Sequence, residues 1–348
     1  MTGAADIDLE GPPSALLEVR DLRVHFKTDY GVVKAVDGVS WSVNEGETLA
    51  IVGESGSGKS VSAMTILGLV PSPPATFPSG DVFLRGRSLL KMPEKQQRKL
   101  RGSQIAMIFQ DPLTALNPVF KVGDQIAEMV RVHQDVSKHV AKKRALDLLG
   151  EVGIPNPAVR LNQYPHEFSG GMRQRAMIAM ALANDPHVLL ADEPTTALDV
   201  TVQAQIMALL EKLQDDRNTA IVLITHDLGV VASYADRINV MYAGRIVESG
   251  TADEIFYSPR HAYTYGLLSS LPRMDQQRQQ RLQPIKGIPP SLARVPQGCP
   301  FHPRCTFATE ACLPEVPSLV SVDGETHRAA CVHSDRVAMA FEDRVGAK

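Results

Sequence analysis

The sequence predicts an α/β fold with a buried parallel sheet. Residues 53–60 read Gly-Glu-Ser-Gly-Ser-Gly-Lys-Ser, the complete Gly-x-x-x-x-Gly-Lys-Ser pattern of a phosphate-binding loop. The loop lies between the apolar, strand-forming run Thr48–Val52 and the helix-forming run Val61–Leu69, which is the order that the motif requires. A second apolar run, Val188–Ala191, precedes two acidic residues and is typical of a parallel strand buried on both faces. Together these features indicate a nucleoside triphosphate site at the carboxyl edge of the sheet.

The remaining elements follow from hydrophobic patterning along the chain. Strand-like runs at Leu17–Val24 and Asp81–Leu84 flank the phosphate loop and alternate with turn-like segments. Helical patterning mixed with charge occupies Gly123–His133 and His139–Val152. From residue 186 to 256 strands and helices alternate again.

The phosphate loop has a chemical reason for its composition. Glycines let backbone N–H groups turn inward around phosphates without a clash from a Cβ atom. Lys59 is expected to reach the β- and γ-phosphates and Ser60 to bind Mg²⁺, while the helix N-terminus favours negative charge. The residues expected to surround the nucleotide are Gly53, Glu54, Ser55, Gly56, Ser57, Gly58, Lys59, Ser60 and Val61. The alternative, a glycine-rich turn without a ligand, is disfavoured by the complete motif in this context.

The acidic residues that follow the second buried strand supply the other half of the site. Asp192 is expected to hold Mg²⁺ through water, and Glu193 to act as the base for the attacking water. Any buried strand can end in an acidic residue, so this motif is weak by itself. Its pairing with the phosphate loop makes the prediction strong.

A glycine-rich helix start lies between these two motifs. Ser169 is a good N-cap for the run that follows, and Gly170 and Gly171 leave the first N–H groups open to an anion. A Ser-Gly-Gly segment placed between a phosphate loop and an acidic strand end resembles the signature motif of ATP-binding cassette (ABC) ATPases. Phe168 and Met172 stand where the general family prefers Leu and Gln, but methionine is usual in the peptide-importer subfamily.

The resemblance implies roles for four more residues. Gln110 matches the glutamine that senses the γ-phosphate and contributes to the Mg²⁺ site, and Asp199 matches the loop that crosses the dimer interface. His226 matches the switch histidine that contacts the γ-phosphate, which makes Gln110, Glu193 and His226 the expected catalytic set. Tyr30 lies where the family places an aromatic ring against adenine, with Phe26 as the alternative.

The motifs resemble even more closely those of the ATPase subunits of bacterial oligopeptide and dipeptide importers. The segments that carry this similarity include Tyr164–His166, Ser258–Thr264 and Gly298–Cys305. The resemblance implies a second ATPase subunit, expected to be a paralogue, with each ATP held between one phosphate loop and the other subunit's Ser-Gly-Gly segment. It also implies two membrane-spanning permease subunits, an extracytoplasmic peptide-binding protein, and a location at the cytoplasmic face of the cell membrane. Nickel and glutathione importers remain alternatives for the solute.

Composition narrows the function classes. The chain has 348 residues and a formal net charge of −3, which argues against a nucleic-acid-binding footprint. Its first fifteen residues contain no Lys or Arg, so we expect no secretory signal, and its apolar runs are too short for a membrane span. The rival is a cassette ATPase that remodels nucleic acid or ribosomes, which commonly has two cassettes or a long coiled coil. A regulatory protein with a dead nucleotide site is disfavoured because Glu193 and His226 are intact.

The full expected architecture has two domains. The resemblance implies a P-loop NTPase (RecA-like) core with an antiparallel β subdomain and a helical signature subdomain, spanning residues 17–257 with the helical part at about 111–184. Residues 258–348 form a small Pro/Cys-rich C-terminal domain, in which many prolines exclude long helices between 284 and 317 and Asp275–Gln283 is a polar connector.

All four cysteines lie in this C-terminal region, at Cys299, Cys305, Cys312 and Cys331. Disulfides are not expected in a cytosolic protein, which leaves a metal site or free thiols. The spacing matches neither zinc ribbons nor ferredoxins, so it does not choose the metal. The resemblance implies a [4Fe–4S] cluster, since some peptide-importer ATPases carry one; zinc and four free thiols stay open.

Overall fold

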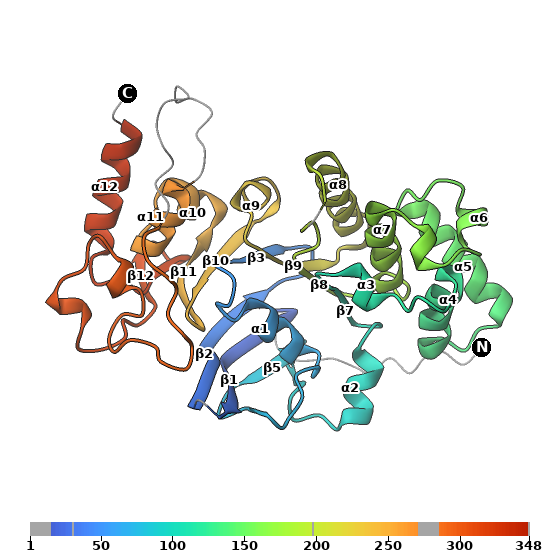
Figure 1. The fold of residues 1–348 in the computed structure, drawn as a ribbon, viewed down its shortest axis with the longest axis horizontal. Coiled ribbons are helices and arrows are strands. Elements are labelled where there is room, and N and C mark those ends of the chain that lie inside the picture. The colour runs from blue at the N-terminus through green and yellow to red at the C-terminus, as the bar shows by residue number, and fades with distance from the viewer. Residues whose placement is uncertain (1–14, 30, 197, 271–284, 347–348) are drawn as a thin grey trace.

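The computed structural model describes residues 15–29, 31–196, 198–270 and 285–346. Figure 1 shows a central sheet with a second, antiparallel sheet beneath it, a helical region at one end and the C-terminal segment at the other. Tyr30 and the predicted connector Asp275–Gln283 lie outside the described residues.

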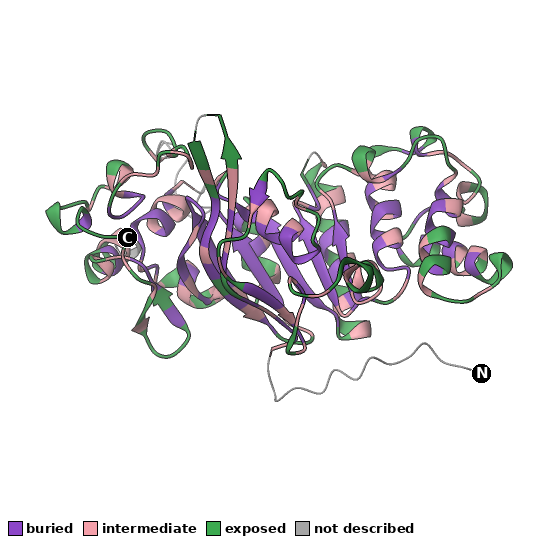
Figure 2. Cartoon of the chain, turned by 90° about the horizontal axis from the view of Figure 1, so that it is seen from below, coloured by how far each residue is buried: buried purple, intermediate pink, exposed green. Residues whose placement is uncertain are grey.

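The central sheet carries the predicted parallel core. Within the described residues it has eight strands in the order β12-β13-β11-β10-β3-β9-β8-β7, of which β10, β3, β9, β8 and β7 are parallel. The strands are β3 Thr48–Val52, β7 Ile105–Ile108, β8 Val188–Asp192, β9 Ala220–Thr225, β10 Arg237–Tyr242, β11 Arg245–Thr251, β12 Val320–Asp323 and β13 His327–Ala329. Every residue of β3, β8 and β9 is buried, as expected of strands covered on both faces. Figure 2 shows this buried interior running through the middle of the molecule.

The second sheet is antiparallel and packs against the central one. Its strands are β1 Leu17–Thr28, β2 Gly31–Val43, β4 Ala75–Thr76, β5 Asp81–Leu84 and β6 Arg87–Ser88. Apolar side chains of β1, β2 and β5 share one hydrophobic core with β3 and with helix α1, Lys59–Ile66. This core fixes the start of α1, and with it the phosphate loop.

The helical region contains the two helices that the patterning predicts. Helices α4, Val122–His133, and α5, Lys138–Glu151, match the predicted ranges to within one residue. The other helical elements before β9 are α2 Glu94–Leu100, α3 Pro112–Ala115, α6 Pro157–Arg160, η1 Pro165–Glu167, α7 Gly170–Ala181 and α8 Val200–Arg217. Apolar side chains of α4, α5, α7 and α8 share one core with β7 and β8, which ties the helical region to the sheet edge.

The C-terminal segment packs directly onto the central sheet. Its β13 pairs with β11, and its buried side chains join one core with those of β3 and β10. After β9, the helical elements of the chain are α9 Leu228–Tyr234, α10 Ala252–Tyr257, α11 Ala262–Ser269, η2 His302–Arg304, η3 Glu310–Cys312 and α12 Ser334–Gly346. Helix α12 follows the last proline, and the sequence reading did not foresee it. In the described ranges, no helix combines the length and apolarity needed to cross a bilayer.

A buried carboxylate holds this segment to the sheet. Glu248 on β11 is fully buried and accepts hydrogen bonds from the backbone N–H groups of Arg260 and His261. The ring of His327 on β13 lies 2.9 Å from the same carboxylate. A carboxylate taken out of water is stable only when its oxygens are hydrogen-bonded, as those of Glu248 are.

We expect Glu248→Ala to lower the free energy of unfolding by about 3 kcal/mol, because it leaves buried donors without an acceptor. Denaturant unfolding of the purified chain measures the effect. Glu325→Ala, at an exposed turn position, is the matched control and should change stability little. Equal stability of the two variants would contradict the anchoring role.

Candidate functional site

The phosphate loop connects β3 to α1 and has almost no room for side chains at two glycines. A Cβ atom on Gly53, where φ is +154°, would lie 2.1 Å from the carbonyl oxygen of Met241. On Gly58, where φ is +106°, it would lie 2.1 Å from the carbonyl oxygen of Ala35. Both contacts are with backbone, which cannot give way as a side chain can. The sequence motif therefore encodes a close approach of the loop to β2 and β10.

Lys59 lies inside the curve of this loop. Its Nζ donates to the carbonyl oxygens of Gly53 at 2.8 Å and Glu54 at 3.0 Å. Burial lowers the pKa of Lys59, and the carboxylates of Glu193, Asp192 and Glu54 oppose that shift. The ammonium thus lies in a partly desolvated position, where it attracts an anion more strongly than in water.

The next residue along α1 joins the loop to the acidic strand end. The Ser60 hydroxyl donates to Oδ1 of Asp192 at 2.9 Å. Burial raises the pKa of Asp192, and the hydrogen bond from Ser60 works against that rise. A hydroxyl and a carboxylate held together are oxygen ligands of the kind that Mg²⁺ prefers. Val61 follows in the first turn of α1, and Ser55, Gly56 and Ser57 complete the loop.

The structure brings the three predicted catalytic side chains together at the ends of neighbouring strands. Nε2 of Gln110, after β7, donates to Oε2 of Glu193 at 2.9 Å. Nδ1 of His226, after β9, lies 3.2 Å from Oε1 of the same carboxylate. The Thr196 hydroxyl donates to Oε2 at 2.9 Å. Glu193 thus has a partner on each side.

The backbone of Glu193 is unusual. Its φ of 46° places it in the left-handed region, which a residue with a side chain rarely adopts. Its N–H donates to the carbonyl oxygen of Ile224 at 2.8 Å, which ties it to β9. Strain of this kind persists only where the surrounding structure enforces it, and here it aims the carboxylate at Gln110 and His226.

The Ser-Gly-Gly segment lies elsewhere, at the start of α7 in the helical region (Figure 1). Ser169 is the N-cap, as predicted, with its hydroxyl accepting from the Met172 N–H at 3.3 Å. A Cβ atom on Gly170 would meet nothing within 4 Å, whereas one on Gly171 would press on Val202. Asp199 caps α8 by accepting from the N–H of Val202 at 2.9 Å. These residues are therefore either unobstructed or bonded to near neighbours in the chain. They lie away from the phosphate loop of their own chain (Figure 1).

Sequence reasoning missed two residues that contact the phosphate loop. The hydroxyl of Tyr263 accepts from the N–H of Glu54 at 2.7 Å, and the guanidinium of Arg304 donates twice to the Glu54 carboxylate. Both residues lie in motifs that carried the resemblance, Ser258–Thr264 and Gly298–Cys305, and that placement was the only signal available.

The four cysteines are free thiols gathered in one part of the C-terminal segment. Burial raises the pKa of Cys299 and Cys331, and raises the pKa of Cys305 to about 11. These shifts favour the protonated thiol, whereas the thiolate is the form that binds a metal. Among the described residues, no group of three or more His, Cys, Asp or Glu side chains is arranged to hold a metal ion. The predicted [4Fe–4S] cluster is therefore not supported by this arrangement.

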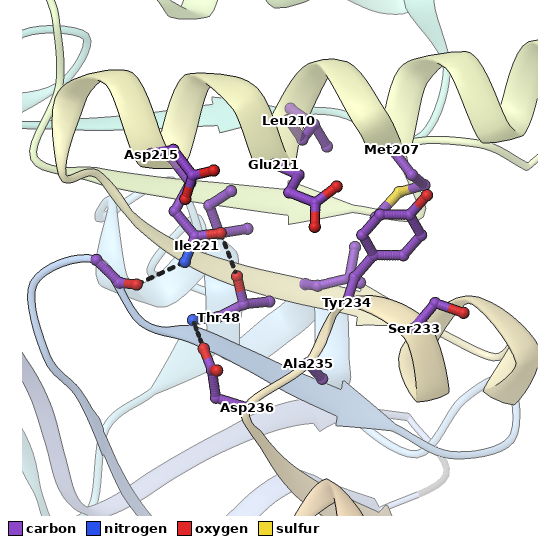
Figure 3. A pocket seen from close by; sticks show the side chains of 13 residues that line it. Thr48, Met207, Leu210, Glu211, Asp215, Ile221, Ser233, Tyr234, Ala235 and Asp236 are labelled. Carbon is purple, nitrogen blue, oxygen red and sulfur yellow. Dashed lines mark hydrogen bonds between the residues drawn. The ribbon is translucent and has the colours of Figure 1, made fainter.

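A cavity of about 320 Å³ opens at the opposite edge of the sheet from the phosphate loop (Figure 3). It lies at the amino ends of β3 and β9, beside α8. Thr48 lines the cavity, and its N–H donates to the Asp236 carboxylate while its hydroxyl donates to the side-chain oxygen of Gln214. The nucleotide residues predicted from the sequence do not line it.

Comparison with known families gives two matches. Residues 36–196 match the ABC transporter family, and residues 247–312 match the C-terminal region of oligopeptide/dipeptide transporters. The first range contains the phosphate loop, the Ser-Gly-Gly segment and the acidic pair. The second contains Tyr263 and Arg304.

Curated relatives and solved structures agree with these matches. The oligopeptide transport ATP-binding protein OppD of Bacillus subtilis is 52% identical, over 96% of this chain and 93% of that protein. A probable peptide ABC transporter ATP-binding protein of Sinorhizobium fredii, y4tR, is also 52% identical, over 92% of this chain and 96% of that protein. The dimeric ATP-binding cassette MJ0796, bound to ADP and Pi in a post-hydrolysis state, aligns with a TM-score of 0.62 and 28% identity, covering 68% of this chain and 98% of that one.

We expect Glu193→Gln to retain ATP binding and to lower turnover by about 100-fold or more, because the amide cannot accept a proton from water. Steady-state hydrolysis and calorimetry of the same preparation separate the two effects. Glu211→Gln, an exposed position on α8, is the control. Hydrolysis by Glu193→Gln near the unmodified rate would refute the assignment.

Proposed function

Because the chain belongs to the ABC transporter family, we propose that it is the ATP-hydrolysing subunit that powers import of di- and oligopeptides across a membrane. The observation that carries the hydrolytic part is the Glu193 carboxylate held between Gln110 and His226. The match of residues 247–312 to the C-terminal region of oligopeptide/dipeptide transporters supports peptides as the solute. Nickel and glutathione stay as alternatives, because substrate contacts would lie on other chains.

The geometry supports a division of labour at the phosphate end of ATP. Loop N–H groups and the Lys59 ammonium would bind the phosphates, and Ser60 with Asp192, which are already hydrogen-bonded to each other, would hold Mg²⁺. When bound, Mg²⁺ neutralises charge on the β- and γ-phosphate oxygens. These residues fit that ion because their oxygens already lie together.

Glu193 accepts a proton from the water that attacks the γ-phosphate. Gln110 and His226 orient its two carboxylate oxygens, one each, and hold the side chain in the position set by its left-handed backbone. Because the three side chains come from the ends of β7, β8 and β9, a shift of Gln110 with the helical region would reach the base directly. Hydrolysis would in this way respond to the position of that region.

We propose that Ser169, Gly170, Gly171 and Asp199 act across an interface with a second ATPase subunit. The support is the open space at Gly170 and the uncovered N-terminus of the 12-residue helix α7, which favours an anion. A paralogue as the second subunit remains part of this proposal. Tyr30 keeps its proposed adenine contact, although it lies outside the described residues.

The remaining partners follow from the family. We propose two permease subunits in the membrane, an extracytoplasmic peptide-binding protein, and peripheral attachment of this chain at the cytoplasmic face through the permeases. The net charge of −3 supports the absence of a nucleic-acid partner. The division at residue 258 is also a proposal, supported by the change of composition there.

A metal centre at the four cysteines remains a separate proposal, with [4Fe–4S] as the expected form. The support is the gathering of Cys299, Cys305, Cys312 and Cys331 against one apolar core. The thiols would have to lose their protons and close around the metal, which couples assembly of the centre to folding of the segment.

The transport proposal is tested by a matched pair of glycine variants in the assembled transporter. Gly170→Leu should leave ATP binding to the isolated subunit unchanged but lower ATP-driven peptide uptake by about tenfold or more, because the side chain fills the interface. Gly150→Leu is the control, since Gly150 also lies in the helical region with nothing within 4 Å of an added Cβ. Loss of ATP binding by folded Gly170→Leu would mean that the segment acts within its own chain.

The metal proposal is tested on anaerobically purified protein, which should be brown and hold about four irons per chain. Changing any one cysteine to Ser should release the iron and expose the segment to proteolysis. A colourless protein with one tightly bound zinc would refute the cluster and show that zinc occupies the site. Metal-free protein with a protease-resistant segment would refute the metal centre.

A further inference from the structure

A buried arginine of the C-terminal segment holds the second residue of the phosphate loop. Nη1 and Nη2 of Arg304 donate to the two carboxylate oxygens of Glu54 at 2.6 and 2.9 Å. The Arg304 side chain is 5% exposed and that of Glu54 is 26% exposed. A planar guanidinium that meets both oxygens of a carboxylate forms one of the strongest and most directional pairs in proteins.

Arg304 is itself held rigidly. Its Nε donates to the carbonyl oxygen of Lys286 at 3.1 Å, and Nη1 also reaches the Tyr242 hydroxyl at 3.3 Å. Its guanidinium carbon lies 5.9 and 5.8 Å from the ring centres of Tyr242 and Phe301. The residue ends the short helix η2, directly before Cys305. Its position therefore depends on how the cysteine-containing segment is folded.

Glu54 is held through its backbone as well. Its N–H donates to the hydroxyl of Tyr263, whose ring packs at 4.6 Å from Tyr242 and 5.4 Å from Phe301. Its carbonyl oxygen accepts from Nζ of Lys59 at 3.0 Å. One residue of the loop thus connects the C-terminal segment to the lysine that faces the phosphates.

A carboxylate in an anion-binding loop needs a reason. Unpaired, the Glu54 side chain would repel phosphates and compete with them for the Lys59 ammonium. Paired with Arg304, its charge is neutralised and its oxygens point toward the C-terminal segment. The alternative is that the pair only attaches that segment to the core. The two accounts predict different ATP affinities when Glu54 is changed together with Arg304.

We propose that Arg304 is a positioning residue for ATP binding, which neutralises Glu54 and holds it away from the phosphates. ATP affinity then depends on the folded state of residues 285–312, which lie far along the chain from the loop. The inference rests on the proposed assignment of residues 53–60 as the ATP site.

The assembled transporter offers a direct test. Arg304→Ala should raise the KM for ATP by about tenfold while kcat changes less than about twofold, because the affected contact orients the binding loop and not the attacking water. Calorimetry on the full-length chain should show the same loss of ATP affinity. Lys59→Ala serves as the reference for the site, since it must weaken ATP binding if residues 53–60 form it. Unchanged binding by Lys59→Ala would refute the site, whatever Arg304→Ala does.

A second substitution separates positioning from attachment. Adding Glu54→Gln to Arg304→Ala should recover most of the lost affinity, since the uncompensated carboxylate is then gone. The ATP affinity of Arg304→Lys should lie between those of Arg304→Ala and the unmodified protein, because lysine keeps the charge but loses the two-pronged contact. If Arg304→Ala does not fold, Arg304→Lys with and without Glu54→Gln gives the same comparison. A KM that stays high in the double variant, or a loss in kcat alone, would overturn the proposal and leave Arg304 as an attachment point.

Discussion

The constraint on which the site depends is the contact of the phosphate loop with backbone on two sides. Gly53 lies against the carbonyl of Met241 at the end of β10, and Gly58 against that of Ala35 in β2. The N–H of Gly244 also donates to the carbonyl oxygen of Ser57 at 2.9 Å. Since none of these atoms can rotate away, the loop has one position relative to both sheets. The antiparallel sheet, which carries none of the residues expected to bind the phosphates, is thus needed to shape the site.

The parallel order of the strands explains how catalytic groups from distant parts of the sequence meet. Because β7, β8 and β9 are parallel neighbours, their carboxyl ends lie side by side, and each supplies one side chain. Gln110 and His226 then meet the two oxygens of Glu193. The left-handed backbone at Glu193 is the local cost of this convergence, and the hydrogen bond to Ile224 offsets part of it.

The sequence predicted the features that depend on residues close to one another along the chain. The phosphate loop, the Ser169 cap and the limits of α4 and α5 depend on residues within a few positions of one another. The Arg304–Glu54 pair and the burial of Glu248 against His327 join residues far apart in the sequence, and no periodicity reports them. Whether the cysteines hold a metal could not be predicted from the sequence, for another reason. Spacing limits which ligands can meet, but burial sets whether their thiols ionise, and burial depends on the tertiary fold.

The end of β10 connects the nucleotide site to the C-terminal segment. Met241 faces the phosphate loop through its carbonyl, and the next residue, Tyr242, contacts Arg304 and packs on Tyr263 and Phe301. On its other edge β10 pairs with β11, which carries Glu248 and pairs with β13. A displacement of the C-terminal segment would therefore reach the loop by two routes, through the strand and through Glu54. Because the strand route is backbone to backbone and the Glu54 route is an ion pair, only the second can be adjusted by changing side-chain charge.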